Sequence, residues 1–301
     1  MVKQIIVDAD NTMGVPGCDT DDGLALVYLL GNPDKAQILG LTCAYGNSTM
    51  GTVYENTCRL ANELEIGAPV FKGGPNPGEP ISDAARFMAE TVAAHPGEVS
   101  ILATGSMTNL KGAALLDEHF FENVAEVVIM GGITQSLVIN GRIMNELNLS
   151  CDAAAAVAVL GASCPVTVAS AQACLPAVFT KREFSERLGS GSWLMQECGY
   201  WFDWMTSGYD IAAFICWDIV AAAALLEPEL FSFEDLPVAL NERLLTVGYL
   251  EHAAADAPQS IVRIPHIKDA DEFKRSCFDA WTHARFEAGG NFVQSVPISC
   301  I

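Results

Sequence analysis

Short apolar runs alternate with helix-like segments along most of the chain. The strand-like runs are rich in Val, Ile and Leu and cover residues 5–7, 38–44, 69–71, 99–105, 124–130 and 166–169. Apolar residues at helical spacing predict helices at 23–30, 49–65, 84–94, 110–116, 153–160, 193–205 and 218–226. This alternation predicts an α/β fold: an open, mostly parallel, Rossmann-like sheet flanked by helices, with a more helical C-terminal portion. No internal repeat or linker interrupts it, so we expect one domain over residues 1–301.

The charge of the chain excludes some classes of partner. Lys and Arg number 16 against 37 Asp and Glu, which gives a net charge of -21. A chain this acidic repels phosphate backbones and anionic membranes, so we expect neither nucleic acid nor a membrane as a partner.

The ten cysteines, Cys300 the last of them, form no C-x-x-C pair, and no signal-like or membrane-length apolar segment is evident. These features favour a reducing cytoplasm.

Carboxylates gather after the first strand-like run. Asp8 and Asp10 are two residues apart, so they share a face of an extended strand, and Asp21 and Asp22 follow just before a helix. A helix N-terminus favours negative charge but cannot neutralise so many neighbouring carboxylates. A bound cation can, and oxygen ligands without His or Cys favour calcium or magnesium over zinc. The alternative is structural, with Asp21 and Asp22 only capping the helix.

The topology predicts where a ligand would bind. In open parallel sheets, ligands lie beyond the carboxyl ends of the strands. The polar residues that follow strand-like runs directly are Asp8, Asp10, Asn47, Thr104 and members of the segment 131–148. We therefore expect these residues to meet at one edge of the sheet.

One known motif fits the acidic residues alone. Residues 8–12 read D-A-D-N-T, which matches the D-x-D-x-T motif of haloacid-dehalogenase-like phosphatases. In that interpretation Asp8 is the nucleophile, Asp10 is the acid, and magnesium is the metal. No late acidic pair follows a strand to hold the magnesium, so this interpretation is kept only as an alternative.

A second set of motifs extends over much more of the chain. Asp8-x-Asp10 followed by Asp21-Asp22 resembles the D-x-D-x-x-x-D-D signature of nucleoside hydrolases. The remaining matches lie in family order: A-Y-G-N at 44–47, T-G-S-M-T-N-L at 104–110, M-G-G at 130–132, Asn140 with E-L-N at 146–148 and Asp152, and W-D at 217–218. The chain thus resembles the nucleoside hydrolase family, of the inosine-uridine preferring N-ribohydrolase kind.

The sequence departs from the family pattern in three places. Ten residues, 11–20, replace the usual three between the two acidic pairs, and Trp217 stands where many members have a histidine. The H-G-rich loop after the third strand is also missing. Asp19 lies in the insertion and has no counterpart in the family, so it is either a surface residue or an extra metal ligand. Residues 17–20 read as a turn, which favours the surface.

The resemblance implies a set of roles for individual residues. Calcium (Ca2+) would be held by Asp10, Asp22, Asp218 and the backbone carbonyl of Thr104, with Asp8 orienting these ligands. Asp21 would be the general base that activates a metal-bound water. The substrate would contact Asn47, Met130, Asn140, Glu146, Asn148 and Trp217.

The implied activity is hydrolysis of the N-glycosidic bond of a ribonucleoside to ribose and free base, in nucleoside salvage, by a homodimer or homotetramer.

Protonation of the leaving base is left open, because Trp217 cannot donate a proton as an imidazolium does and none of the five histidines lies in a motif. Trp201, Trp204 and Tyr209 either line the pocket or pack into the core. A further alternative is a non-catalytic ribose-binding protein on the same scaffold.

Overall fold

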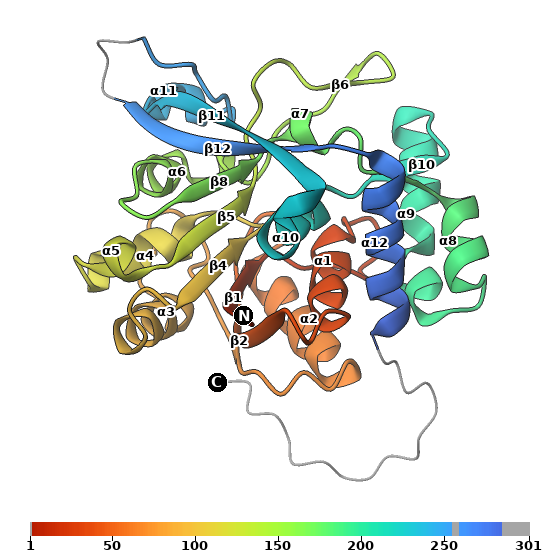
Figure 1. The fold of residues 1–301 in the computed structure, drawn as a ribbon, viewed down its shortest axis with the longest axis horizontal. Coiled ribbons are helices and arrows are strands. Elements are labelled where there is room, and N and C mark those ends of the chain that lie inside the picture. The colour runs from red at the N-terminus through yellow and green to blue at the C-terminus, as the bar shows by residue number, and fades with distance from the viewer. Residues whose placement is uncertain (1, 255–258, 285–301) are drawn as a thin grey trace.

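One mixed sheet forms the centre of the computed structural model, which describes residues 2–254 and 259–284. Its strand order is β11-β12-β8-β5-β4-β1-β2-β3 (Figure 1). The strands are β1 (Lys3–Ala9), β2 (Ala36–Cys43), β3 (Val70–Phe71), β4 (Val99–Ala103), β5 (Glu126–Met130), β8 (Val166–Ala169), β11 (Phe231–Ala239) and β12 (Gln259–Ile267). Neighbours pair in parallel except β11 and β12, which are antiparallel. The predicted α/β fold with a mostly parallel sheet is confirmed.

Helices cover both faces of this sheet (Figure 1). One face carries α3 (Asp83–Ala94), α4 (Thr108–Leu116), α5 (Phe120–Asn123), α6 (Ala153–Leu160) and α11 (Glu242–Leu245). The other carries α1 (Asp21–Leu30), α2 (Met50–Glu63), α10 (Trp217–Leu226) and α12 (Ala270–His283). Beyond α12 lie α8 (Lys181–Leu188), α9 (Trp193–Tyr209) and the strand pair β9 (Val178–Thr180) and β10 (Ala213–Ile215). The short α7 (Ala171–Cys174) follows β8, and β6 (Val138–Ile139) pairs with β7 (Arg142–Ile143) in a small hairpin.

The strand sequences explain why both faces are covered. In β1, Ile5 and Val7 pack into the core beneath α1 and α10, whereas Ile6 between them packs into the core beneath α3 and α4. Successive side chains of a strand point to opposite faces, so an unbroken apolar run requires apolar partners on both sides. The continuous apolar runs seen in the sequence therefore mark central strands.

The C-terminal portion contains the one large feature that the sequence pattern did not predict. Helices α8, α9, α10 and α12 agree with the expected helical character, but β11 and β12 add a long antiparallel pair at the sheet edge. Their residues are only partly buried, and β11 contains Pro237. Proline is tolerated in an edge strand because no ladder hydrogen bond is lost there.

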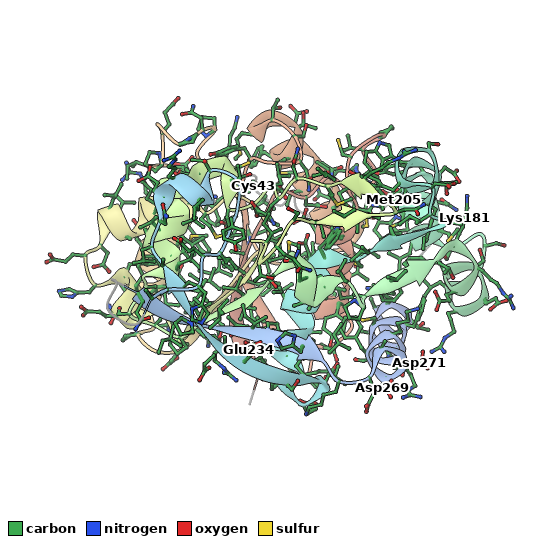
Figure 2. The ribbon with its side chains drawn as sticks, turned by 90° about the horizontal axis from the view of Figure 1, so that it is seen from above. Cys43, Lys181, Met205, Glu234, Asp269 and Asp271 are labelled. Carbon is green, nitrogen blue, oxygen red and sulfur yellow. The ribbon has the colours of Figure 1, made fainter. Side chains whose placement is uncertain are left out.

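The view from above separates this edge from the strand ends at which a ligand is expected. Glu234 on β11 and Asp269 before α12 both lie on the lower side of this view, whereas Cys43 at the end of β2 lies on the upper side (Figure 2). None of the described helices has both the length and the apolar character needed to cross a membrane. Cys300 lies outside the described residues, and the single-domain organisation over 1–301 stays a prediction.

A partly buried ion-pair network links the elements of the helical layer. Glu227, just after α10, accepts hydrogen bonds from Tyr28 of α1, from Ser276 of α12 and from Lys35, whose Nζ lies 2.6 Å away. Burial opposes the charge of Glu227, but the bonds from these three donors outweigh burial and hold the pKa below its usual value. Two helices and the start of β2 thus depend on one ionised carboxylate.

We predict that Glu227→Gln lowers the free energy of unfolding at pH 7 by about 1–3 kcal/mol, because the charged hydrogen bonds are lost. The pKa of Glu227 is lower in the folded state than in the unfolded state, so its ionised form stabilises the fold at pH values above the unfolded-state pKa. This stabilisation is lost as the pH falls through the folded-state pKa. The gap between wild type and variant should therefore close below about pH 4. Urea denaturation from pH 3 to pH 8, with the exposed Glu90→Gln as control, measures this; a gap independent of pH would contradict it.

Candidate active site

The topology places the end of β1 at a special position in the sheet. Strand β1 pairs with β2 on one side and with β4 on the other, so the strand order reverses direction there. At such a switch point the loops leave in opposite directions and open a crevice at the carboxyl ends. Asp8 and Asp10 lie at the end of β1, and Asn47 and Thr104 follow β2 and β4. The expected convergence on one edge is observed.

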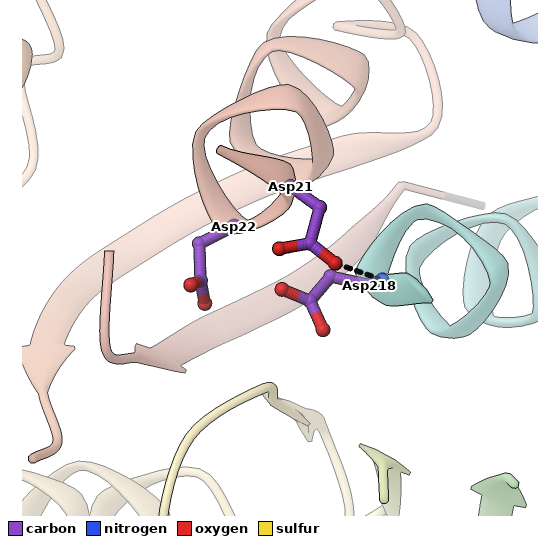
Figure 3. Close-up of side chains that lie close together, drawn as sticks. All are labelled: Asp21, Asp22 and Asp218. Carbon is purple, nitrogen blue, oxygen red and sulfur yellow. Dashed lines mark hydrogen bonds between the residues drawn. The ribbon is translucent and has the colours of Figure 1, made fainter. Parts of the chain in front are cut away.

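Three carboxylates meet beside this crevice. Asp21 and Asp22 are the first residues of α1, and Asp218 is in the first turn of α10 (Figure 3). All three are buried, and one oxygen from each lies within 4.8 Å of the others. Oδ2 of Asp21 accepts bonds from the backbone N–H groups of Trp217, at 3.0 Å, and Asp218, at 3.2 Å. The N-terminus of α10 therefore holds Asp21 in place.

The electrostatics of this cluster are unfavourable without a cation. Burial raises the pKa of Asp22 and of Asp218 well above the usual value, and the neighbouring carboxylates, Asp10 and Asp21 among them, raise both further. Within the described ranges, no lysine or arginine pairs with Asp21, Asp22 or Asp218. Buried, unpaired carboxylates with only oxygen donors are the chemistry that a hard divalent cation requires. The residues present thus fit a calcium or magnesium site.

Asn47 links the two acidic pairs. Its backbone N–H donates to Oδ2 of Asp10 at 2.5 Å, and its Nδ2 lies 3.2 Å from Oδ1 of Asp10 and 3.3 Å from Asp22. The Thr104 hydroxyl donates to the other oxygen of Asp22 at 2.7 Å. Burial raises the pKa of Asp10 to about 6, against the lowering effect of the Asn47 bond. The ends of three strands, β1, β2 and β4, and helix α1 are therefore joined through these hydrogen bonds.

Asp8 lies deeper than the other acidic residues. It is fully buried, and Nδ2 of Asn109 donates both to Asp8 and to the carbonyl of Cys43, each at 2.8 Å. Burial raises the pKa of Asp8 to about 7. Asp8 is fully buried and does not line the pocket, which argues against its role as the phosphatase nucleophile. Asn109 was missed as a site residue, although it lies in the T-N-L motif at 108–110.

A pocket opens over the carboxylate cluster. Of the residues expected in the site, eight line it: Asp21, Asn47, Thr104, Met130, Glu146, Asn148, Trp217 and Asp218. Asp10 and Asp22 lie behind this wall, bonded to Asn47. Asn145 also lines the pocket and was missed; its place in the M-N-E-L-N run was the available signal.

Two of the expected substrate residues also brace the pocket. Glu146 accepts bonds from three backbone N–H groups, those of Gly132 at 3.1 Å, Leu149 at 2.7 Å and Ser150 at 2.9 Å. Asn148 donates from Nδ2 to the carbonyls of Thr104, at 2.8 Å, and Met130, at 3.0 Å. Both side chains therefore fix the loop after β5 against the strand ends.

Asn140 is placed differently from the expectation. It is exposed at the turn of the β6–β7 hairpin, does not line the pocket, and donates to the carbonyl of Tyr209 at 3.1 Å. Its φ of 47° and the φ of 77° at Gly141 are those of an Asn-Gly hairpin turn. The six-residue step to Glu146 matched the family, but the Asn-Gly pair was the stronger local signal.

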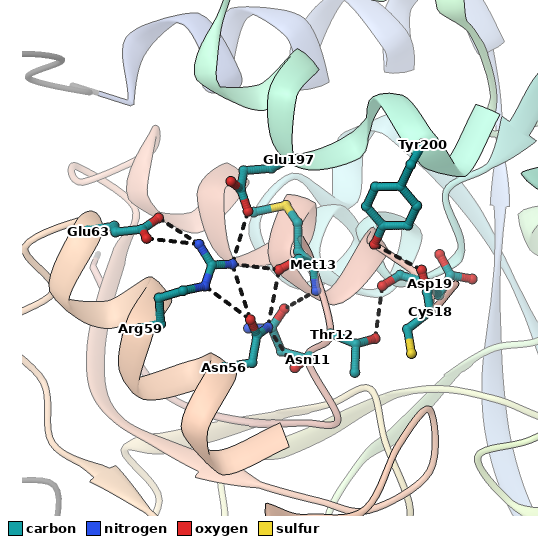
Figure 4. Close-up of polar contacts among 10 residues, drawn as sticks. All are labelled: Asn11, Thr12, Met13, Cys18, Asp19, Asn56, Arg59, Glu63, Glu197 and Tyr200. Carbon is teal, nitrogen blue, oxygen red and sulfur yellow. Dashed lines mark hydrogen bonds and ion pairs between the residues drawn. The ribbon is translucent and has the colours of Figure 1, made fainter. Parts of the chain in front are cut away.

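Asp19 also departs from the expectation, because it lines the pocket and is only partly exposed. The Tyr200 hydroxyl donates to the carbonyl of Cys18 at 3.0 Å, and the Thr12 hydroxyl donates to the carbonyl of Asp19 at 2.9 Å (Figure 4). These bonds fold the segment 11–20 back against α9, which turns Asp19 inward. Burial and the charge of Asp21 raise the pKa of Asp19 well above its usual value.

Helix α9 supplies an aromatic wall. Trp201, Trp204 and Tyr209 all line the pocket, and the rings of Trp201 and Trp204 stack with centroids 4.3 Å apart. All five histidines are exposed and none lines the pocket. The aromatic residues noted in the sequence thus line the pocket, which combines apolar surface with carboxylates.

The family of the chain follows from this site and from comparison with known proteins. The profile of the family described as inosine-uridine preferring nucleoside hydrolase matches residues 5–275. The chain belongs to this family and is an enzyme of the nucleoside hydrolase class. The resemblance found in the sequence motifs is confirmed.

Two relatives illustrate the range of the family. The chain is 27% identical over 283 residues to a probable uridine nucleosidase 2 of Oryza sativa subsp. japonica, with 82% of this chain and 81% of that protein covered. It is 26% identical over 272 residues to the inosine-uridine preferring nucleoside hydrolase of Crithidia fasciculata, with 79% and 83% covered.

Solved structures share the fold. A plant nucleoside hydrolase superposes with a TM-score of 0.79 at 21% identity, covering 93% of this chain and 99% of that one. A purine-preferring ribonucleoside hydrolase from Gardnerella vaginalis gives 0.78 at 20% identity, with 94% and 99% covered.

The position of the segment 11–20 depends on Arg59. One guanidinium nitrogen donates to the carbonyl of Met13 at 2.8 Å and pairs with Glu197 of α9 at 2.9 Å, while another pairs with Glu63 (Figure 4). We predict that Arg59→Ala lowers the free energy of unfolding by about 1–3 kcal/mol and speeds amide hydrogen exchange in residues 11–20. Urea denaturation and exchange mass spectrometry measure the two effects.

The control is Arg182→Ala, which removes an exposed pair with Glu186 on α8. Exposed helix pairs contribute only about 0.3–0.5 kcal/mol. Equal exchange in residues 11–20 in both variants would show that Arg59 does not anchor the segment.

Proposed function

We propose that the protein hydrolyses the N-glycosidic bond of a ribonucleoside, or a closely related N-riboside, to ribose and free base in a calcium-dependent reaction. The observation that carries this is the buried group Asp21, Asp22 and Asp218 at the edge of a pocket that also presents amides and an aromatic wall. Relatives named as uridine nucleosidases and as an inosine-uridine preferring hydrolase support a nucleoside substrate.

The metal ligands would be Asp10, Asp22, Asp218 and the carbonyl of Thr104. Their burial without basic partners supports this assignment, and Asp21 lies close enough to the group to share it. Calcium bound there would supply positive charge that lowers the pKa of a neighbouring water.

Asp21 would act as the general base. Among the cluster carboxylates, Asp21 and Asp218 face the pocket, and Oδ2 of Asp21 is held by two backbone N–H groups. This leaves Oδ1 to accept a proton from the water that attacks the anomeric carbon. The attack passes through an oxocarbenium-like transition state, so a correctly placed base and a fixed sugar dominate the rate.

The sugar and the base would occupy different ends of the pocket. Asn47 and Asn148 offer amides to the ribose hydroxyls near the strand ends, and Met130 and Glu146 complete that end. Trp217 lies at the start of α10 beside Asp21 and offers a flat surface to the base. Buried polar groups that hold hydroxyls discriminate strongly against sugars lacking them. Assembly as a homodimer or homotetramer stays a prediction.

The first experiment is a reducing-sugar assay for ribose on a panel of purine and pyrimidine ribonucleosides, with and without a calcium chelator. Release that the chelator abolishes and added calcium restores is the expected result. Magnesium-dependent release of phosphate from phosphate esters would favour the phosphatase alternative instead. Calcium-dependent binding of ribose without turnover of any nucleoside would favour the non-catalytic alternative.

We predict that Asp21→Asn lowers kcat by about 10²–10⁴-fold, because an amide cannot accept the proton from water. Its oxygen can still accept the two backbone bonds from α10, so the fold and calcium binding should be retained. Steady-state kinetics and calcium titration of the same preparation measure both properties.

Asp10→Asn distinguishes the two carboxylates. A rise in KM with unchanged kcat in Asp21→Asn would mean that Asp21 holds the sugar. In that case, a large loss of kcat in Asp10→Asn measured with calcium bound at saturation would move the role of base to Asp10.

Loss of a residue that only orients a metal ligand weakens metal binding by roughly 10–100-fold. We predict that Asp218→Asn weakens calcium binding by more than this, because Asp218 would be a ligand itself. The amide keeps the shape of the side chain but removes one of the charges facing the cation. Isothermal titration calorimetry with calcium measures the effect, and the exposed Asp203→Asn on α9 is the control. Equal affinity in wild type and Asp218→Asn would exclude Asp218 as a ligand.

A further inference from the structure

The aromatic wall of the pocket is a continuous row of rings. Trp201 and Trp204 stack with centroids 4.3 Å apart, and the ring centroid of Tyr209 lies 6.0 Å from that of Trp204. All three residues line the pocket, and Trp204 is 40% exposed, so a ligand can reach its ring. The faces of such rings are electron-rich and attract a cation that lies against them.

The charged residue types that line the pocket are all of one sign. Among the described residues of its lining, Asp19, Asp21, Glu146 and Asp218 are acidic, and none is a lysine, an arginine or a histidine. The whole chain carries a net charge of -21. The field of the protein and the aromatic wall therefore both favour a positively charged ligand.

The same lining determines how a base can leave the sugar. A neutral base departs with negative charge unless a proton reaches it, and a well-placed acid contributes about 10²–10⁴-fold to such a step. All five histidines are exposed and lie outside the pocket lining. The indole of Trp217 donates a hydrogen bond but does not release its proton. The pocket thus suits a base that needs no proton in order to leave.

Other side chains of the lining are poorly suited to supply that proton. Burial raises the pKa of the Cys18 thiol, which makes it a weaker acid. Oδ1 of Asp19 accepts the backbone N–H of Thr20 at 2.6 Å, and the Asp19 side chain makes a hydrogen-bonding contact with that of Asp21. Asp19 is therefore engaged with the carboxylate cluster.

Building on the proposed function, we propose that the pocket takes N-ribosides whose base is a cationic aromatic ring, such as the riboside of pyridinium. When such a compound is hydrolysed, the bond from the anomeric carbon to the ring nitrogen breaks, and both of its electrons pass to the nitrogen. The oxygen of water forms the new bond to the anomeric carbon, and a proton of that water passes to Asp21 and then to solvent. The products are ribose and a neutral base.

The two ends of the pocket match the movement of positive charge in this reaction. The charge begins on the ring of the substrate, where the aromatic wall can stabilise it. As the bond breaks, the charge passes to the ribosyl group at the end of the pocket that Asp21 and Asp218 line. Each end therefore presents groups that stabilise the positive charge it receives.

The first test compares the riboside of pyridinium with uridine and inosine as substrates of the calcium-bound enzyme. Without a proton donor, the neutral nucleosides lose the roughly 10²–10⁴-fold that an acid contributes. The kcat/KM for the pyridinium riboside should therefore exceed that for either nucleoside by at least about 10-fold, as measured by release of ribose. A ratio below this value would overturn the proposal.

A second test introduces an imidazole. Trp217→His keeps the backbone N–H that holds Asp21 and adds a proton donor to the lining. The ring nitrogen of pyridinium has no lone pair to accept that proton, so only the neutral nucleosides can gain. The ratio of kcat/KM should fall by about 3- to 100-fold, part of the contribution of an acid. A smaller fall, or a rise, would show that proton donation does not limit the wild type and would overturn the proposal.

A binding measurement tests the aromatic wall without turnover. Isothermal titration calorimetry on the calcium-bound protein compares the cation 1-methylnicotinamide with 3-methylbenzamide, a neutral ring of the same shape. The cation should bind about 2- to 30-fold more tightly, the range for a cation over an aromatic face. Trp204→Leu should reduce this preference, whereas Trp204→Phe, which keeps a ring, should retain it. Equal binding by the wild type, or an unchanged preference in Trp204→Leu, would overturn the role of the wall.

The two assays distinguish failure of this proposal from failure of the proposed function. If uridine or inosine is hydrolysed in a calcium-dependent reaction but the pyridinium riboside is not preferred, hydrolysis stands and the cationic substrate class is overturned. If no riboside is hydrolysed but the cation binds preferentially through Trp204, the proposed function fails and recognition of a cationic ring stands.

Discussion

Mutual repulsion among buried carboxylates is the constraint on which the rest of this structure depends. Asp10, Asp21, Asp22 and Asp218 come from three separate segments and lie together almost fully buried, with Asp21 and Asp218 at the wall of the pocket. Desolvation and like charge both oppose this arrangement, so the fold must compensate at each residue. The backbone N–H groups of α10, the amide of Asn47 and the hydroxyl of Thr104 provide part of that compensation, and a divalent cation would provide the remainder.

The sheet makes this concentration of charge geometrically possible. Strands buried on both faces form a rigid base, and the reversal of strand order at β1 directs neighbouring loops apart. Asn148 and Glu146 then tie the loop after β5 to the strand ends through backbone groups. Residues that family motifs suggest as substrate contacts therefore also hold the pocket together, and replacing them would alter both functions at once.

The sequence predicted those parts of the molecule in which local pattern and tertiary context agree. The parallel strands around β1 are continuous apolar runs, and the acidic residues after β1 follow from topology. The strands β11 and β12 were not predicted because their half-exposed residues and Pro237 lack a clear period. Motif spacing suggested Asn140 as a pocket residue, whereas the structure has it in an Asn-Gly turn of the β6–β7 hairpin. The inward position of Asp19 could not be predicted, because it depends on a contact of the segment 11–20 with Tyr200, 181 residues farther along the chain.

The location of the segment 11–20 has a thermodynamic consequence. The segment is flanked in the chain by Asp10 and Asp21, and Arg59 and Tyr200 bond it to the surroundings of α9. Any ligand that orders this wall therefore also restricts the carboxylates on either side of it. If such a ligand strengthens metal binding by a certain free energy, thermodynamic linkage requires that the metal strengthens binding of the ligand by the same free energy. If the carboxylates hold the proposed metal, a substitution that alters how a ligand orders this wall would alter metal affinity as well.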